Sequence, residues 1–457
     1  MSFWKIAWRN LQQRAFASSL TGLSMALGVA LVVVVLVTYE LVVVQLSNDA
    51  QGYHLIIGAG QGSKTEIVLS TVFHIGTPLY TFSYRHYQKF VDGEYAPYVD
   101  VAVAICLGDS FQSPDGTRFR VVGTTPAMFD ELSYAADAAY EFSAGRNFKQ
   151  ENFFEAVVGS VVAHRSGLKV GDKFEPTHGI SSGGDKHREF TVVGVLAPTG
   201  TANDRAVFVN MEGFYLLAGH ALAPQNVAYC PECGQPLPTG HPLAPPPRSS
   251  PGSTPHEIQF DEDGKPLPLP DDQREVTSVL LRCKDFLYPS RIETRVNKGD
   301  DRAIQAVMPR QIVEKLKEGF LAPMRLILLV LTVMIVVVAG ISILVSIYNS
   351  MKERSHDIAV MRALGASRNA VMAIIVVESV LLSILGGAAG LLIGHGALAA
   401  ASPVVENYTG ITVALWDVSR QELLLIPGLL VFAAVVGFLP AVTAYRTDVA
   451  GTLAGVK

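Results

Sequence analysis

Residues 326–350 read LILLVLTVMIVVVAGISILVSIYNS and contain no charged side chain. An α-helix needs about 20 apolar residues to cross the hydrocarbon core of a bilayer. Arg325 precedes this stretch and Lys352 follows it closely, and charged flanks of this kind sit at the two membrane interfaces. The stretch therefore predicts a membrane-spanning helix, and the other apolar stretches decide the rest of the fold.

Three further stretches have the same character. Residues 15–39 and 423–445 carry no charge, and residues 370–401 contain only Glu378 and His395 as ionisable groups. The first stretch could be a signal peptide, but it is much longer than the 7–15 apolar residues, roughly, that such a peptide uses. We therefore predict four transmembrane helices, within residues 15–46 (with a stalk), 321–350, 370–401 and 423–446.

The composition agrees with a membrane protein. Only 17% of the 457 residues are charged, whereas soluble domains average about 25%. The net charge of −5 and the lack of a basic tract argue against a nucleic-acid partner. Four cysteines are too few for a disulfide scaffold.

Basic residues in the short connections predict the orientation. They gather in the N-terminal tip and between the second and third spans, at Lys5, Arg9, Arg14, Lys352, Arg354, Arg362 and Arg368. Residues 1–14, 351–369 and 447–457 should thus be cytoplasmic, whereas 47–320 and the short loop 402–422 should lie outside. Trp4, Ala7, Trp8 and Leu11 recur at helical spacing, so residues 1–14 are expected to form an amphipathic helix at the cytoplasmic interface.

The third span carries two notable features. Gly386, Gly390 and Gly394 repeat every fourth residue, which predicts a helix face where a second backbone packs closely. Glu378 is costly against lipid and should face another helix or a cavity.

The long outer segment predicts an α+β domain. Alternating apolar residues and turn signals indicate strands at 99–106, 117–124, 156–158, 189–196 and 206–209, and helices near 84–91, 211–218 and 309–320. Residues 219–275 depart from this pattern, since 13 of the 25 prolines of the chain lie between positions 220 and 272. This stretch is expected to be an insertion without packed secondary structure.

The insertion contains Cys230-Pro231-Glu232-Cys233-Gly234, with His241 downstream. Two thiolates at this spacing suit one zinc ion, and Cys230, Cys233 and His241 are the candidate ligands. A disulfide is an alternative, because thiols outside the cytoplasm tend to oxidise. A remnant without function is the third possibility, and the sequence leaves all three open.

The connection between the second and third spans reads MKERSHDIAVMRALGAS at 351–367. It predicts a charged extension of the second span that Gly365 terminates. Ile358, Met361 and Leu364 form a small apolar group among the charges. That group suits a helix that docks on a partner, although a solvated connector explains the charges equally well.

The string KER…IAVMRALGAS closely resembles the signature of FtsX-like, MacB-type ABC transporter permeases. Pro440-Ala441-Val442-Thr443-Ala444-Tyr445-Arg446 is similar to the P-A-x-x-A-x-R ending of the same family. Within the outer segment, Gly159-Ser160 through Asp204 resembles the MacB periplasmic core. The predicted layout matches this family over nearly the whole chain.

The resemblance implies a permease of the bacterial cytoplasmic membrane that contains no catalytic residue or cofactor of its own. ATP would bind to a separate cytoplasmic ATPase dimer, and a second permease copy or paralogue would complete the assembly. Movement of the outer domain would serve export, extraction of a lipoprotein or peptide, or mechanotransmission. The ATPase-contact residues that the resemblance implies are Glu353, Ile358, Met361, Arg362 and Leu364. The alternative from another class is a membrane-anchored metal-binding or redox protein that uses Cys230 and Cys233.

Overall fold

The computed structural model describes residues 3–13, 15–48, 51–135, 138–179, 186–217, 219–220, 260–261, 264–353, 355–409, 422 and 425–445. The chain divides into two compact units. The helical unit comprises Met1–Val43, Lys317–Val404 and Thr412–Lys457, and the α+β domain comprises Val44–Leu316 with Val405–Ile411.

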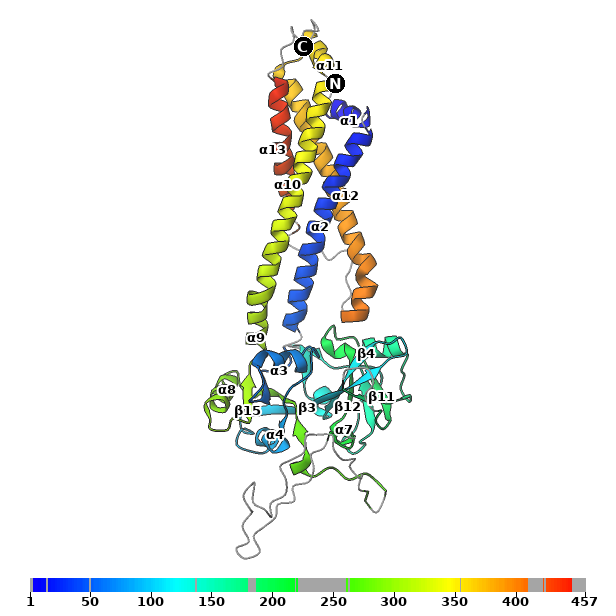
Figure 1. The fold of residues 1–457 in the computed structure, drawn as a ribbon, viewed down its shortest axis with the longest axis vertical. Coiled ribbons are helices and arrows are strands. Elements are labelled where there is room, and N and C mark those ends of the chain that lie inside the picture. Colours follow the sequence, from blue (N-terminus) through cyan, green and yellow to red (C-terminus); the bar gives the residue numbers. More distant parts are fainter. Residues whose placement is uncertain are drawn as a thin grey trace, which may run out of the picture. The chain divides into compact units, whose positions relative to one another are not determined.

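The helical unit is built from six α-helices in the described part of the chain. They are α1 (Phe3–Gln13), α2 (Ala15–Asn48), α10 (Ala322–Glu353), α11 (Ser355–Ala363), α12 (Arg368–Thr409) and α13 (Leu425–Tyr445), shown in Figure 1. A π-helical turn, η3 (Lys317–Leu321), precedes α10.

Three helical stretches among the described residues are long and apolar enough to cross a bilayer, namely Ala15–Ser47, Pro309–Asn349 and Arg368–Val405. They contain the first three predicted spans. The fourth predicted span coincides with α13, a helix of 21 residues. Many large apolar side chains of the unit are exposed, among them Leu326, Val333 and Leu392, as is expected of surfaces that face lipid.

Apolar contacts between the helices hold this unit together. One buried cluster joins Met25 of α2, Ile343 and Ile347 of α10, Ile375 of α12 and Val436 of α13. A second cluster, around Val29, Val33 and Val37 of α2, packs on Leu391 and Leu398 of α12. Every one of the long helices therefore contributes to a common interior.

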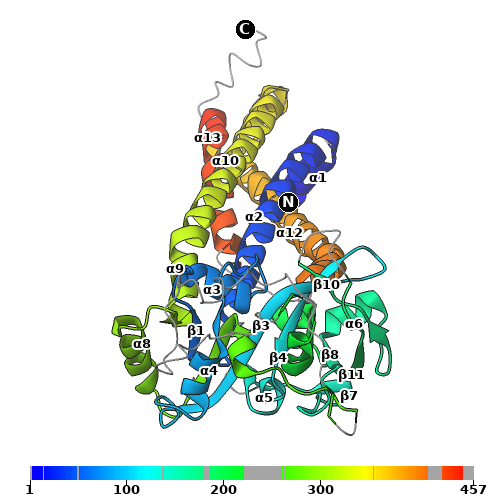
Figure 2. The ribbon, with the colours of Figure 1, turned by 60° about the horizontal axis from the view of Figure 1, so that its bottom comes forward.

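The α+β domain is centred on one mixed sheet of 11 strands, with the path β15-β1-β14-β3-β4-β12-β8-β11-β7. Figure 2 shows this path from β1 through β3 and β4 to β11 and β7. The strands on the path are β1 (Leu55–Ala59), β3 (Val99–Gln112), β4 (Arg118–Thr124), β7 (Phe142–Gly145), β8 (Glu155–Val158), β11 (Phe190–Leu196), β12 (Ala206–Asn210), β14 (Ser278–Cys283) and β15 (Ile304–Val307). Two short strands lie off it, β9 (Lys173–Phe174) on β11 and β10 (Thr177–His178) on β3.

Helices cover both faces of this sheet. The helices are α3 (Lys64–Thr71), α4 (Tyr84–Val91), α5 (Ala127–Asp130), α6 (Ser160–Ser166), α7 (Met211–Tyr215), α8 (Tyr288–Lys298) and α9 (Pro309–Leu316). Phe90 of α4 and Phe214 of α7 pack in one buried cluster, and Val68 of α3 and Ile312 of α9 pack in another. All five residues of β12 are buried, which explains why its sequence is apolar without alternation.

Two small two-stranded sheets complete the strands. One pairs β2 (Phe82–Ser83) with β13 (Glu275–Val276), and the other pairs β5 (Ser133–Ala135) with β6 (Ala138–Ala139). Two 3-10 turns, η1 (Ala202–Arg205) and η2 (Asp271–Gln273), complete the helical elements. The strands and helices predicted from the sequence of this domain are confirmed, with ends that shift by a few residues. The largest shift is in β3, which runs to Gln112 rather than stopping at Cys106.

Candidate functional site

The connection between the second and third predicted spans is helical. Helix α10 ends at Glu353, α11 follows, and Gly365 adopts a φ of +104° after α11. Such a left-handed residue terminates a helix at little cost only when it is glycine. Ser367 Oγ then accepts a hydrogen bond from the backbone N–H of Ala370 at 3.2 Å, so that α12 starts directly afterwards.

The apolar side chains of this connection point in different directions. Ile358 is buried against the interior of the helical unit, and Met361 packs on the same cluster. Leu364 is 84% exposed, and Val360 is exposed to a lesser degree. The expected apolar group is thus divided. Ile358 is a core residue rather than a surface contact, because it belongs to a buried cluster with residues of α10, α12 and α13.

The two charged residues that were predicted to contact the ATPase differ in what the structure describes. Arg362 is half-buried, whereas the side chain of Glu353 lies outside the described residues. Among the predicted contact residues, Leu364 presents the largest exposed fraction in the described part of the chain.

The glycine stripe of α12 faces α2. A Cβ added at Gly386 would stand 2.9 Å from Cβ of Met25, and one at Gly390 would stand 2.6 Å from the carbonyl oxygen of Ala26. A Cβ at Gly394 would stand 2.9 Å from Cβ of Val33. All three separations are shorter than ordinary van der Waals contacts, so these positions admit only glycine without a shift of α2.

Two polar sites lie inside the helical unit. Glu378 of α12 is 8% exposed, as expected for an ionisable group that avoids lipid. His395 of α12 contacts Glu422, with Nε2 2.8 Å from Oε2. Glu422 is 3% exposed, and the sequence analysis did not anticipate this pair because the two residues lie in different segments.

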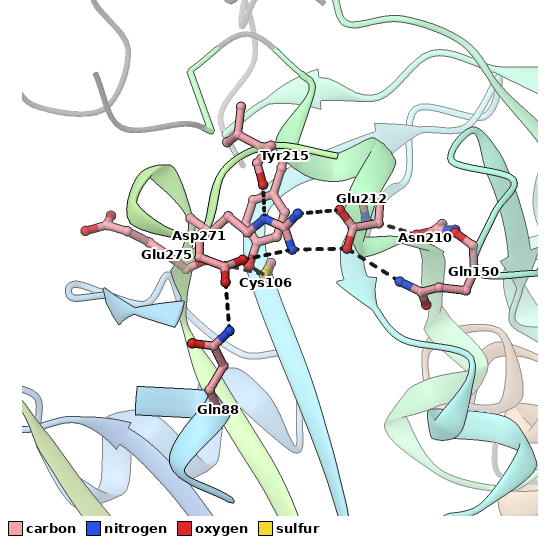
Figure 3. A network of polar contacts seen from close by, with 10 residues as sticks. Gln88, Cys106, Gln150, Asn210, Glu212, Tyr215, Asp271 and Glu275 are labelled. Atoms are coloured by element: carbon pink, nitrogen blue, oxygen red, sulfur yellow. Dashed lines mark hydrogen bonds and ion pairs between the residues drawn. The ribbon is translucent and has the colours of Figure 1, made fainter. Parts of the chain in front are cut away.

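In the α+β domain, a buried ion pair joins Glu212, which precedes the proline-rich insertion, to Arg274 near the end of the insertion. The last residues of the range 219–275 are therefore packed, contrary to the prediction, and they include η2 and the first residue of β13. Arg274 Nη2 lies 3.1 Å from Glu212 Oε2, and Arg274 Nη1 donates to Glu212 Oε1 at 3.2 Å. Figure 3 shows Glu212 in this network, on the side opposite Asp271 and Glu275. Two opposite charges in direct contact can be buried together, whereas a single charge without a partner cannot.

Neighbouring groups extend this network on both sides. Gln150 Nε2 donates to Glu212 Oε1 at 3.4 Å, and Tyr215 Oη donates to the carbonyl oxygen of Glu275 at 3.0 Å. Asp271 accepts a bond from Gln88 Nε2 at 2.7 Å (Figure 3). Side-chain contacts therefore bind the segment from Asp271 to Glu275 to helices α4 and α7.

The described cysteines are not part of a metal site. Cys106 and Cys283 are both free and buried. Burial raises the pKa of the Cys106 thiol to about 12 and that of Cys283 to about 11. Thiols with such pKa values are inert at neutral pH. Cys230, Cys233 and His241 lie outside the described residues, so their proposed role remains a prediction.

Three histidines surround one aspartate near the C-terminal end of β3, where the short strand β10 pairs with it. The nitrogens and oxygens that Asp109, His178, His187 and His220 offer all lie within 4.8 Å of one another. Asp109 is fully buried, and His220 Nε2 lies 2.9 Å from its Oδ1. Burial by itself raises the pKa of the Asp109 carboxyl, but the three imidazoles outweigh burial and hold that pKa well below its usual range.

The sequence did not indicate this cluster. The local signal was Asp109, an acidic residue that follows the apolar stretch 101–107 in the same strand. The three histidines follow no spacing rule, because each belongs to a different segment of the chain.

Two family models match the chain. Residues 18–227 match the MacB-like periplasmic core domain, and residues 329–449 match the C-terminal region of FtsX-like permeases. The two matches share no residue. The first includes most of the candidate span Ala15–Ser47, and the second includes the later part of Pro309–Asn349 and all of Arg368–Val405.

Relatives of known name give the same result. The chain is 28% identical over 190 residues to the macrolide export ATP-binding/permease protein MacB of Bordetella avium, and 33% identical over 137 residues to an uncharacterized ABC transporter permease of Methanocaldococcus jannaschii. These matches cover 40% and 28% of this chain, and 28% and 33% of those relatives, so the chain spans a third of their length or less.

One solved structure is the extracellular domain of the noncanonic ABC-type transporter YknZ from Gram-positive bacteria. It aligns over 55% of this chain and 98% of its own length, at 12% identity and a TM-score of 0.28.

Proposed function

Since this chain belongs to the FtsX-like, MacB-type ABC transporter permeases, we propose that it couples ATP turnover in a separate cytoplasmic ATPase to movement of its α+β domain. The observation that carries the proposal is the pair of family matches, one on the α+β domain and one on the helices that follow it. The chain itself would not hydrolyse ATP.

The proposed topology has four spans, with α13 as the fourth, in the bacterial cytoplasmic membrane. It is supported by the three candidate spans and by the 21 uncharged residues of α13. The basic residues near α11 then place that helix in the cytoplasm, and the α+β domain lies outside. Labelling of single cysteines introduced at Arg118 and at Ala363 tests this, because a membrane-impermeant maleimide should reach only the first from outside.

The ATPase would contact the end of α11. Leu364 supports this proposal because it is a large apolar side chain with 84% exposure, at the tip of a short helix. Exposed leucine next to charged residues is typical of a helix that docks in a partner's groove. Burial of Ile358 removes it from the proposed contact surface and leaves it a supporting role within the unit.

Relay of the ATPase movement would pass through the long helices. Helices α9, η3 and α10 follow one another without an interruption of the chain, from Pro309 in the α+β domain to Glu353 beside α11. Closure of two ATPase subunits would bring two such permeases together, as a homodimer or with a paralogue. Export, lipoprotein or peptide extraction, and mechanotransmission to an envelope partner are all compatible with such a relay.

The decisive experiment replaces Leu364 with Asp. The full-length chain would be co-expressed with a candidate ABC ATPase from the same genome, and co-purification and ATPase rate would be measured in nanodiscs. We expect L364D to lose both ATPase retention and stimulation. Phe286→Asp is the matched control, because Phe286 is an equally exposed apolar residue (81%) in the α+β domain. Unchanged co-purification and stimulation in L364D would refute the contact.

A further inference from the structure

We infer that Asp109, His178, His187 and His220 form a binding site for a divalent transition metal ion of the zinc type. This inference concerns the α+β domain alone and does not depend on the proposed coupling to an ATPase. The first observation in its support is that four potential ligand atoms, from four separate segments of the chain, lie within 4.8 Å of one another.

The backbone holds these ligands in place. Strand β10 pairs with β3 so that His178 stands directly opposite Asp109. The backbone N–H of Gly179 donates to the carbonyl oxygen of Gly108 at 3.0 Å, and the N–H of His187 donates to that of Pro176 at 2.9 Å. The positions of three of the ligands are thus set by strand pairing rather than by flexible side chains.

His220 reaches the same point from the other side. It follows α7, and its ring packs on Phe214 with the ring centroids 4.2 Å apart. A Cβ added at Gly108 would lie 3.0 Å from Cε1 of His220, so glycine directly before Asp109 leaves the space that this ring occupies.

The three imidazole rings enclose the carboxylate. Their centroids are 5.2–5.6 Å apart in each of the three pairs. The nitrogens that face Asp109 are Nδ1 of His178 at 3.5 Å, Nε2 of His187 at 3.5 Å and Nε2 of His220 at 2.9 Å. A tetrahedral zinc site separates its ligand atoms by about 3.3 Å. The two 3.5 Å separations are close to this value, the 2.9 Å contact would lengthen around an ion, and the wider separations in the set, up to 4.8 Å, would shorten.

Two buried polar atoms face one another in this space. Asp109 Oδ2 and His187 Nε2 lie 3.5 Å apart, and neither makes a hydrogen bond among the described residues. Asp109 is 0% exposed, and the side chain of His187 is 3% exposed. A buried polar atom without a partner is costly to the fold, and a cation between these two atoms would satisfy both.

The remaining contact supports the same site. A carboxylate oxygen can only accept, so Nε2 of His220 must carry the proton that it donates to Asp109 Oδ1. A metal ion would take the place of this proton, as it does whenever imidazole becomes a ligand.

The donor set selects the class of ion. Three imidazole nitrogens and one carboxylate oxygen suit zinc, nickel, copper or iron, whereas magnesium and calcium prefer oxygen donors. Four protein ligands leave a tetrahedral ion no open position, which is typical of structural rather than catalytic zinc. The side chain of His178 is 48% exposed and provides the route by which the ion enters.

Such an ion would join distant parts of the domain. It would tie β3 and β10 to His220, which lies 111 residues beyond Asp109 and at the start of the predicted insertion. Metal occupancy would thereby determine whether the base of the insertion is held against the sheet.

The test uses the full-length chain in detergent with Cys230→Ser and Cys233→Ser as the reference protein, which removes the other candidate thiolate site. Cobalt(II) is the probe, because four-coordinate cobalt absorbs visible light strongly, and zinc competition then gives the zinc affinity. We expect one cobalt per chain, displaced by zinc, and a higher melting temperature in the presence of zinc.

His178→Ala in this reference protein should weaken the affinity on the order of 100-fold or more, since even changes around a ligand cost 10–100-fold. The exposure of His178 makes a folding defect from this change small. His164→Ala is the matched control, because His164 is an exposed histidine on α6, and it should leave the affinity unchanged. Asp109→Asn provides a second variant and should also abolish the visible absorption.

Equal affinities of the His178→Ala and His164→Ala proteins would overturn the inference, as would a reference protein that binds no cobalt. The chain with its native cysteines is compared with the reference protein. Thiolate-to-cobalt charge-transfer bands that appear only in the chain with Cys230 and Cys233 would place the ion at these cysteines instead. The L364D protein should bind metal normally, so failure of the proposed coupling and failure of this site are distinguished.

Discussion

Glu212 and Arg274 lie 62 residues apart in the sequence, yet Glu212 Oε2 and Arg274 Nη2 are 3.1 Å apart in the folded α+β domain. Glu212 precedes the predicted proline-rich insertion and Arg274 lies near the end of it, and both side chains are at most 8% exposed. The pair therefore closes the base of the insertion, so that the stretch between them begins and ends at one point on the surface of the domain.

Removal of one partner of this pair should be strongly destabilising. Glu212→Leu removes the buried counter-charge of the Arg274 guanidinium and leaves only the half-exposed Asp271, 3.7 Å away. Removal of one partner of a buried ion pair typically costs about 3–5 kcal/mol. Lys173→Met is the control, because the Lys173–Glu189 pair is more than half exposed on both sides and such pairs contribute at most about 1 kcal/mol. Thermal unfolding of the purified proteins measures both. Equal melting temperatures for the two variants would contradict the prediction.

His74 should make the α+β domain less stable in mild acid. Burial, together with Arg120 and Arg205, lowers the pKa of His74 to about 4, although a hydrogen bond with Asn203 opposes this shift. The unfolded chain binds the proton near pH 6.5 and the folded chain does not, so stability is complete above pH 6.5 and falls as the pH approaches 4. The full loss is about 3 kcal/mol.

The melting temperature of a His74→Asn protein should fall less over this pH range than that of the unchanged protein. Asparagine suits the site because His74 has a φ of +55°, a conformation that asparagine tolerates. The same substitution at the exposed His164 should leave the pH profile unaltered. Identical profiles for all three proteins would show that His74 does not carry the effect.

The contact of α12 with α2 should tolerate no side chain at Gly390. A leucine there would collide with Ala26 and Val29 of α2, and overpacking of this kind typically costs about 1–3 kcal/mol. Gly396 lies one and a half turns further along α12 and has open space where its Cβ would be. Melting in detergent should therefore separate Gly390→Leu from a nearly neutral Gly396→Leu, and a reversed order would refute the assigned face.

Ile358 and Leu364 should differ in what their replacement damages. Ile358→Asp places a charge in the buried cluster of the helical unit and should cost several kcal/mol, roughly, in stability. Leu364→Asp changes an exposed side chain. Its free energy of unfolding should therefore stay within about 0.5 kcal/mol of that of the unchanged chain. A stable Ile358→Asp protein would mean that α11 is not anchored through this residue.

Several features of the site follow from local sequence alone. Gly365 ends α11 because its position in the chain requires a left-handed residue, and the apolar length of 326–350 requires a helix that spans a bilayer. Some strands of the α+β domain, such as β4 and β11, were also predictable, because alternation and turn residues such as Gly116 act within a few positions, whereas β1, β14 and β15 were not predicted. These signals are local, so the printed sequence contains them.

The arrangement of these elements was not predictable in the same way. Nothing near Ile358 in the sequence indicates that it is buried while Leu364 is exposed, since both residues are apolar and separated by less than two turns. The burial of Ile358 depends on Val371 and Val436, which come from other helices. Likewise the mixed sheet, with β12 parallel to β4 and antiparallel to β8, depends on pairings between distant strands.

By itself, the sequence determined that the chain has long apolar helices, an α+β domain and the motifs of a permease family, because hydropathy, periodicity and short motifs are properties of neighbouring residues. The tertiary structure alone decided that Asp109 meets His178, His187 and His220, and that Glu212 meets Arg274. The physical reason is that such contacts arise only when strand pairing and helix packing bring remote segments together, and no local pattern records which segments those will be.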